Sequence, residues 1–206
     1  MCQHFACSAR AIVWYNSFMV LSDRDIKKAL QDKKIVITPK PDLATQLGSN
    51  SLDLRLGNIF RIFDHSKHAF IDPAKKDYSN EITKKVVVAD GEPFIMQPGD
   101  FVLAVTLERV KIPSNMMGRL EGRSSLGRLG IVVHSTASIF DAGWDGKCVL
   151  ELGNMGRMAV KLTPGMRICA MSFEQLSSEA DIPYNKKKSA KYVIQQEPLE
   201  SKYHED

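Results

Sequence analysis

The chain of 206 residues has a net charge of +4 and is 44% hydrophobic and 25% charged, which is the usage of an ordinary globular domain. So mild a positive charge argues against a dedicated nucleic-acid binder, which needs a concentrated basic face, but it suits a small anionic ligand. No apolar run approaches the roughly 18 residues of a membrane span. The four cysteines form no Cys-x-x-Cys pair, which predicts free thiols in a reducing, cytoplasmic setting and no zinc site.

The chain divides into three predicted parts. Residues 1–18 contain a short apolar stretch without a convincing secretory cleavage site, and we expect an N-terminal extension outside the core. Residues 19–180 fit a single domain, whose first helix is predicted by Ser22 and the acids that follow it, with Ile26 and Leu30 on the buried face. Residues 181–206, which contain no glycine, are expected to form an arm that orders on a ligand.

From Ile35 onward the pattern is typical of strands. Apolar and polar residues alternate over 52–56, and Gly57-Asn58 predicts a turn before another strand at 59–63. The polar stretch 64–80 is expected to be a loop. Further short apolar runs occupy 85–88, 94–96, 101–105, 110–113, 148–152, 159–162 and 168–173. Strands and helices do not alternate, so we predict a mainly β barrel or sandwich with a few short helices.

The run Gly122-Arg123-Ser124-Ser125-Leu126-Gly127-Arg128 concentrates groups that suit an anion. Its two arginines stay ionised and can fork onto phosphate oxygens. A short helix beginning there would also aim its first backbone amides at the anion. The spacing leaves two interpretations open, a phosphate site or a serine-capped surface helix with solvated arginines. It matches neither a Walker loop nor a dinucleotide fingerprint.

Two acidic residues follow downstream. Asp141 lies in a predicted turn, and Glu151 lies in a strand where it shares one face with Val149 while Leu150 faces the other way. A carboxylate among apolar neighbours suits proton transfer, and a solvated strand glutamate is the plain alternative. For His134, which follows an apolar run, we favour a packed, hydrogen-bonded imidazole over a general base.

These segments together resemble the dCTP deaminase family of the dUTPase-like superfamily. The resemblance covers roughly Met19 to Gln196, and its specificity comes from nine motifs in order. The motifs lie at 22–26, 51–57, 98–101, 122–128, 134–137, 141–144, 150–151, 164–166 and 184–196. The resemblance implies a distorted, jelly-roll-like β-barrel of the dUTPase type, assembled as a homotrimer whose active sites are shared between neighbouring subunits.

The resemblance also implies which residues bind dCTP. The family's Mg²⁺ is carried on the nucleotide phosphates and held mostly through them and water. Asp141 would bind the 3′-hydroxyl of the deoxyribose, and the backbone from Val149 through Leu150 to Glu151 would recognise the cytosine edge. The groups implied for the triphosphate are Arg123, Ser124, Ser125, Leu126, Gly127 and Arg128, aided by Tyr184, Lys191 and Gln195.

The implied reaction is hydrolytic deamination without zinc. The Ser124 hydroxyl and the backbone at Thr136-Ala137 would position a water against C4 of cytosine. Glu151 would accept its proton, protonate N3 and later protonate the leaving ammonia. Arg128 would stabilise this arrangement electrostatically. The His-x-Glu and Pro-Cys-x-x-Cys signature of zinc deaminases is absent from the sequence.

Three alternatives stay open beside conversion of dCTP to dUTP and ammonia. A bifunctional relative would form dUMP and pyrophosphate, and Ser138 fits neither family pattern at that position, although Trp144 favours the monofunctional one. A plain dUTPase is disfavoured because the arm at 181–206 lacks the glycine-rich segment of that class. A non-catalytic nucleotide-binding barrel is disfavoured by the intact acid and phosphate motifs. Feedback by dTTP has no motif of its own in the sequence.

Overall fold

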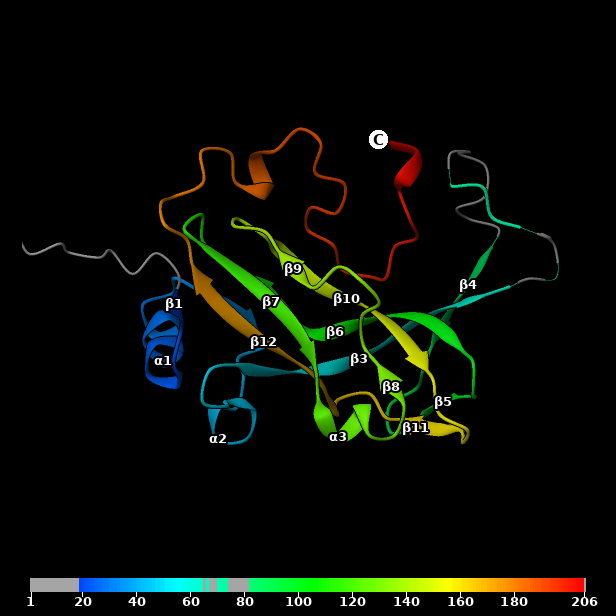
Figure 1. Cartoon of the computed structure of the whole chain (residues 1–206). Coiled ribbons are helices and arrows are strands. Elements are labelled where there is room, and N and C mark those ends of the chain that lie inside the picture. Colours follow the sequence, from blue (N-terminus) through cyan, green and yellow to red (C-terminus); the bar gives the residue numbers. More distant parts are fainter. Residues whose placement is uncertain (1–18, 65, 67–69, 74–81, 206) are drawn as a thin grey trace, which may run out of the picture.

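The computed structural model describes residues 19–64, 66, 70–73 and 82–205. The expected extension at 1–18 and most of the predicted loop at 64–80 lie outside the described residues. In the part of the chain that is described, no helix is long and apolar enough to cross a membrane. Strands dominate the element order (Figure 1), which confirms the predicted mainly β class with few short helices.

The elements follow the chain in this order: β1 (Met19–Val20), α1 (Asp23–Gln31), β2 (Val36–Thr38), α2 (Leu43–Gln46), β3 (Leu52–Phe63), β4 (Thr83–Val87), β5 (Phe94–Met96), β6 (Phe101–Lys111), β7 (Met116–Gly122), α3 (Ser124–Gly127), β8 (Ile131–Val132), β9 (Ile139–Phe140), β10 (Asp145–Asn154), β11 (Val160–Leu162), β12 (Arg167–Gln175), and the 3₁₀ turns η2 (Tyr184–Lys186) and η3 (Tyr203–Glu205).

One antiparallel sheet organises the described chain. Its strands run in the order β8-β10-β6-β3-β12-β7-β9, with β1 on β12, β2 on β6 and β4 on β3, while β5 and β11 pair separately. Strand β3 belongs to both halves, because Leu52–Arg55 pair with β12 and the residues from Leu56 onward pair with β6 and β4. The sheet therefore turns about β3 and encloses the core.

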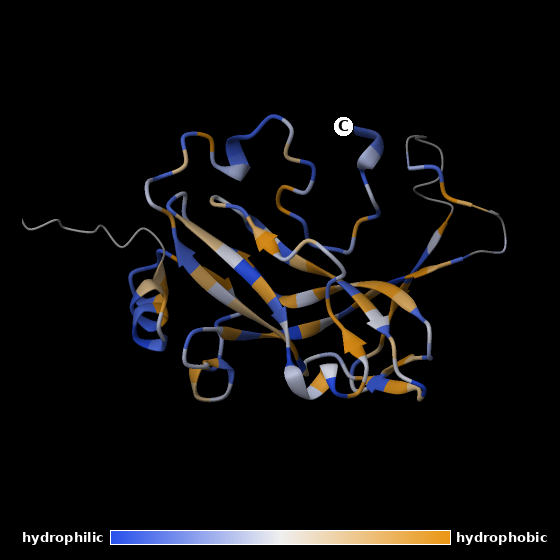
Figure 2. Cartoon of the chain, in the orientation of Figure 1, coloured by the Kyte–Doolittle hydropathy of each residue, from blue (hydrophilic) through white to orange (hydrophobic). Residues whose placement is uncertain are grey.

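The alternating pattern of β3 is confirmed, since Leu52, Leu54, Leu56 and Phe60 are all fully buried. The predicted first helix is confirmed as α1, where the Ser22 hydroxyl accepts a hydrogen bond from the Asp25 N–H at 3.4 Å. Ile26 of α1 is fully buried, and Leu30 packs against the core from a partly buried position. Figure 2 shows the apolar residues along the strands and the polar residues on the outer side of α1.

The predicted turn at Gly57-Asn58 is wrong, because β3 continues from Leu52 to Phe63 without a break. The glycine instead permits a close approach of two strands, since a Cβ at Gly57 would lie 2.9 Å from the carbonyl oxygen of Val105. The separate strands predicted at 101–105 and 110–113 are likewise parts of one strand, β6. A glycine within a strand marks backbone contact as often as it marks a bend.

The prediction of free thiols holds for the two described cysteines, Cys148 and Cys169, which are unpaired and fully buried. Burial raises the pKa of the Cys148 thiol to about 12. Both side chains therefore behave as small apolar groups of the core. Cys2 and Cys7 lie outside the described residues.

A buried carboxylate joins α2, β3 and β6. The Glu108 side chain is fully buried. Its Oε1 accepts hydrogen bonds from Arg55 Nε at 2.6 Å and from Gln46 Nε2 at 3.1 Å, and its Oε2 accepts from the backbone N–H of Arg55 at 2.8 Å. Removing one partner of such a network leaves the others desolvated and unsatisfied, which is where the cost arises.

We therefore predict that Glu108→Ala lowers the free energy of unfolding by about 3–5 kcal/mol. Urea titration followed by circular dichroism measures the change. The matched control is Lys27→Ala, whose ion pair with Asp23 is about half exposed and whose loss should cost less than about 1 kcal/mol. Equal, small effects of the two substitutions would show that the buried network adds little to stability.

Candidate active site

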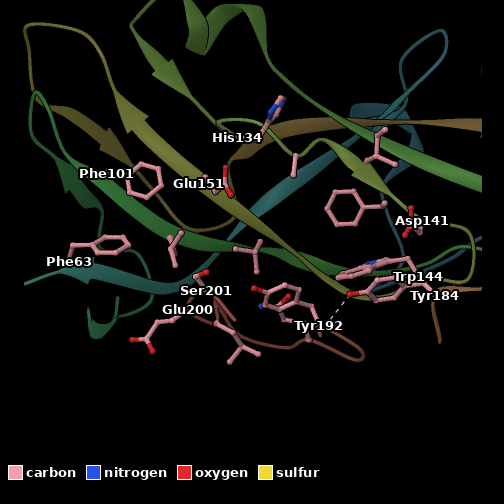
Figure 3. Close-up of a pocket in the computed structure, with 17 residues that line it drawn as sticks. Phe63, Phe101, His134, Asp141, Trp144, Glu151, Tyr184, Tyr192, Glu200 and Ser201 are labelled. Carbon is pink, nitrogen blue, oxygen red and sulfur yellow. Dashed lines mark hydrogen bonds between the residues drawn. The ribbon is translucent and has the colours of Figure 1, made fainter. Parts of the chain in front are cut away.

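A cavity of about 430 Å³ lies between β10, the segment around β9 and the chain that follows β12 (Figure 3). Glu151 lines its middle, Asp141 lies toward one end with Trp144 and Tyr184, and Phe63 lies toward the other end. The cavity therefore collects residues from segments that are far apart in the sequence.

The outer edge of β10 explains why a cavity forms there. Neighbouring residues of a strand direct their N–H and C=O groups to opposite edges. At one end of this edge, Asp145 C=O and Lys147 N–H bond to Ile194 N–H and Gln195 C=O at 3.0 and 2.8 Å. At the other end, the N–H of Glu151 donates to Val133 C=O at 3.0 Å.

Val149 lies between these two ends of the edge. The same alternation points its N–H and C=O outward, and Val149 lines the cavity. The gap between the tail and β8 thus presents one donor and one acceptor from a rigid strand.

The Glu151 carboxylate is held in place by the backbone. Its Oε2 accepts a hydrogen bond from the Ser135 N–H at 2.8 Å. Glu151 is partly exposed and shares its face of β10 with Val149, whereas Leu150 is fully buried on the other face. The predicted division of faces is therefore confirmed, but the predicted role of the Leu150 backbone in recognising a base is not supported, because Leu150 pairs with Ala104 of β6 on the inner edge and does not line the cavity.

Aromatic rings form the wall beside Asp141. Phe140 and Trp144 meet edge to face with centroids 5.0 Å apart, and Trp144 lies 5.4 Å from Tyr184. The turn between them needs a glycine, because Gly143 has φ +84° and a Cβ there would lie 2.6 Å from Pro183 Cβ. Gly143 thus admits the C-terminal segment to the site.

Two tyrosine hydroxyls tie the C-terminal segment to itself. Tyr184 Oη accepts from the Tyr192 N–H at 3.1 Å, and Tyr192 Oη accepts from the Lys202 N–H at 3.0 Å. Burial raises the pKa of Tyr184, and the charge of Asp141 acts in the same direction. Tyr184 therefore keeps its proton and can donate a hydrogen bond to a ligand.

Some of the predicted site residues lie together in the cavity of a single chain. The lining of the cavity includes the predicted residues Ala137, Asp141, Val149, Glu151, Tyr184 and Gln195. Lys191 is not among the lining residues. Gln195 is nearly fully buried against β10, and a Cβ at Gly146 would lie 3.0 Å from its backbone nitrogen.

The predicted phosphate cluster lies elsewhere. Helix α3 is at the opposite end of the molecule from the C-terminal segment (Figure 1), and none of its residues lines the cavity. Leu126 is buried, while Ser124, Ser125, Gly127 and Arg128 are exposed.

The helix is also not capped by a serine. Its N-cap is Arg123, which makes no side-chain capping bond. Arg123 Nη2 instead lies 3.4 Å from Asp53 Oδ2, and its Nη1 donates to the Arg167 C=O at 3.3 Å. This ties the first arginine of the cluster to β3 and β12.

Sequence reasoning missed several lining residues. His134, expected to be a packed and hydrogen-bonded imidazole, lines the cavity, and its buried Nδ1 has no hydrogen-bond partner among the described residues. Its Nε2 lies 3.9 Å from Glu121. Tyr192 and Glu200 gave no signal because only the path of the tail brings them to the cavity.

The cavity is poor in positive charge. Its described lining includes the carboxylates Asp141, Glu151 and Glu200 but no lysine or arginine. A polyphosphate would be repelled there, since like charges at close range cost free energy. The lining therefore suits the uncharged part of a ligand, and a polyanionic part needs cations that this lining does not supply. In the described chain, His, Cys, Asp and Glu side chains gather in no group of three that could hold a metal ion.

Comparison with known proteins gives the family. Residues 20–176 match the family model described as dCTP deaminase-like. The chain is 54% identical over 188 residues to a dCTP deaminase of Thermomicrobium roseum, covering 91% of this chain and 95% of that protein. It is 48% identical over 188 residues to a dUMP-forming dCTP deaminase of Dictyoglomus turgidum, covering 91% and 96%.

A solved structure shows the same fold. The 2′-deoxycytidine 5′-triphosphate deaminase of Agrobacterium tumefaciens superimposes with a TM-score of 0.60 at 21% identity, covering 77% of this chain and 48% of that one. With the family match, this confirms the predicted fold class. The chain belongs to the dCTP deaminase family.

Proposed function

We propose that this chain deaminates dCTP hydrolytically to dUTP and ammonia and so feeds the synthesis of dUMP and dTTP. The observation that supports this most directly is the Glu151 carboxylate, which the Ser135 N–H holds at 2.8 Å inside a cavity beside the outward edge of Val149. A fixed carboxylate next to a strand edge provides a proton acceptor and a base-recognition surface in one place.

The nucleoside of dCTP fits the arrangement of the lining residues. The cytosine edge presents an amino donor beside ring acceptors, which complements the N–H and C=O of a strand. Asp141 supplies an acceptor for the 3′-hydroxyl, and Trp144 with Tyr184 supplies an apolar wall for the sugar. The uncharged part of the nucleotide thus occupies the cavity, and its triphosphate extends outside.

Proton transfer by Glu151 accounts for the reaction. A water positioned by the Ser124 hydroxyl and by the backbone at Thr136-Ala137 attacks C4 of cytosine while Glu151 takes its proton. Glu151 then protonates N3. In the second half of the reaction, Glu151 takes the proton of the added hydroxyl and delivers it to the amino group, which departs as ammonia. The electrostatic stabilisation is assigned to Arg128.

A second copy of the chain is needed for this chemistry, because α3 of the same chain does not reach the cavity. We propose a homotrimer in which Arg123 to Arg128 of one subunit hold the triphosphate over the cavity of its neighbour, with Tyr184, Lys191 and Gln195 of the tail. Mg²⁺ then arrives on the phosphates, held by their oxygens and water.

Formation of dUMP and pyrophosphate is the second candidate. It is favoured by the name of the Dictyoglomus turgidum relative, which is dUMP-forming at 48% identity, and by Ser138, which departs from both family patterns. Trp144 favours the simple deaminase. Chromatography of the products decides between them, because the first candidate yields dUTP and ammonia in equal amounts and the second yields dUMP and pyrophosphate.

We predict that Glu151→Gln lowers kcat for ammonia release by at least about 10³-fold, because the amide cannot shuttle the proton. Binding of dCTP, measured by isothermal titration, should stay within about threefold, because the amide keeps the size and one acceptor of the side chain.

The control is Glu92→Gln, an exposed position that should leave both quantities unchanged. A Glu151→Gln enzyme that releases ammonia at the normal rate would remove Glu151 from the mechanism.

A further inference from the structure

The end of the chain forms one wall of the cavity. Leu199, Glu200 and Ser201 line it together with Phe63 of β3, and Figure 3 shows Glu200 and Ser201 on the tail at the Phe63 side of the cavity. This wall belongs to a segment without regular secondary structure, so something other than a sheet ladder must fix it.

Arg61 of β3 supplies the main attachment. Its Nε donates to the Pro198 C=O at 2.7 Å, and its Nη1 donates to Glu200 Oε1 at 2.9 Å and to Thr83 Oγ1 at 3.0 Å. The side chains of Arg61 and Glu200 are only 18% and 8% exposed, so this ion pair is poorly screened by solvent.

The register of β3 and β4 explains why the attachment and the cavity lie on one face. Arg61 is opposite Lys85, and Phe63 is opposite Thr83. Residues two apart in a strand share a face, so Arg61, Phe63, Thr83 and Lys85 all point to the same side. The lining ring of Phe63 and the guanidinium of Arg61 are therefore neighbours on β3, which is paired with β4 on one side and with β6 on the other.

We propose that Arg61 is a positioning residue for nucleotide binding: with Glu200 it forms a latch that holds residues 198–201 as a wall of the Glu151 cavity. The proposal deepens the proposed function and rests on it for the identity of the nucleotide. The latch itself is a property of the described contacts alone.

The charges of the cavity make Arg61 the more sensitive partner. Without the guanidinium, the carboxylate of Glu200 stays in a lining that includes the carboxylates of Glu151 and Asp141 but no lysine or arginine. An uncompensated carboxylate in a poorly solvated position favours release of its segment into water. Glu200→Gln removes that repulsion and keeps the hydrogen bond from Arg61 to Pro198. We therefore expect Glu200→Gln to loosen the segment less than Arg61→Met does.

A second ion pair between the neighbouring strand and the tail provides the control. Lys85 Nζ lies 2.6 Å from Glu197 Oε2, but these side chains are 40% and 41% exposed, and neither residue lines the cavity. The two pairs join the same tail segment to neighbouring strands, Arg61 on β3 and Lys85 on β4. They differ in burial and in contact with the cavity.

The test uses three variants of the latch: Arg61→Met, Glu200→Gln and the double variant that carries both. Lys85→Met is the control. Arg61→Met should raise KM for dCTP roughly tenfold and leave kcat within about twofold, because the wall contributes to binding and not to the reacting bond. Tryptic cleavage after Lys202, followed by mass spectrometry, should accelerate by a similar factor as the segment opens. The double variant should be no worse than Arg61→Met alone, and Lys85→Met should change neither quantity.

Two results would overturn the latch. One is an equal effect of Lys85→Met and Arg61→Met, and the other is no change in KM or in the cleavage rate with Arg61→Met. If Arg61→Met does not fold, Glu200→Gln still tests it through a smaller shift in both quantities. The cleavage assay needs no turnover, so an enzyme inactive on dCTP but with the expected order of cleavage rates would contradict the proposed function and leave the latch standing.

Discussion

The outer edge of β10 is the constraint on which the site depends. Its inner edge is paired with β6 along most of its length, whereas its outer edge is shared by the tail at Asp145–Lys147 and by Val133 and β8 from Glu151 onward. The unpaired stretch between them leaves backbone groups that a folded protein must satisfy. A ligand that carries its own donors and acceptors completes the sheet there, and Glu151 lies at the border of this gap.

The distribution of charge separates proton transfer from triphosphate binding in the proposed enzyme. The cavity gathers carboxylates around an apolar wall, and helix α3, where we propose that the triphosphate binds, is at the opposite end of the molecule from the C-terminal segment. The lining of the cavity supplies the carboxylate for proton transfer, whereas a triphosphate needs cations close to it. The proposed trimer would satisfy both demands, because each copy would present α3 to the cavity of another.

Local patterns could be predicted from the sequence, and long-range ones could not. The alternation at 52–56 and the opposed faces of Leu150 and Glu151 follow from strand periodicity, so these predictions are confirmed. Gly57 was assigned to a turn because its role depends on Val105, distant in sequence. The cavity wall at Glu200 depends on Arg61, which is 139 residues away, and no spacing rule connects such a pair. The pattern of short apolar runs was enough to predict the fold class, but the sequence motifs predict only part of the cavity lining.

In the proposed trimer, the catalytic carboxylate and the phosphate-binding arginine of one site come from different subunits. Mixing Glu151→Gln and Arg128→Ala subunits after joint refolding tests it, because each variant alone lacks one essential group in every site. In randomly mixed trimers about one site in four combines an intact Glu151 with an intact Arg128 of its neighbour. We predict recovery of about a quarter of wild-type ammonia release. Activity that stays at the mean of the two inactive parents would contradict it.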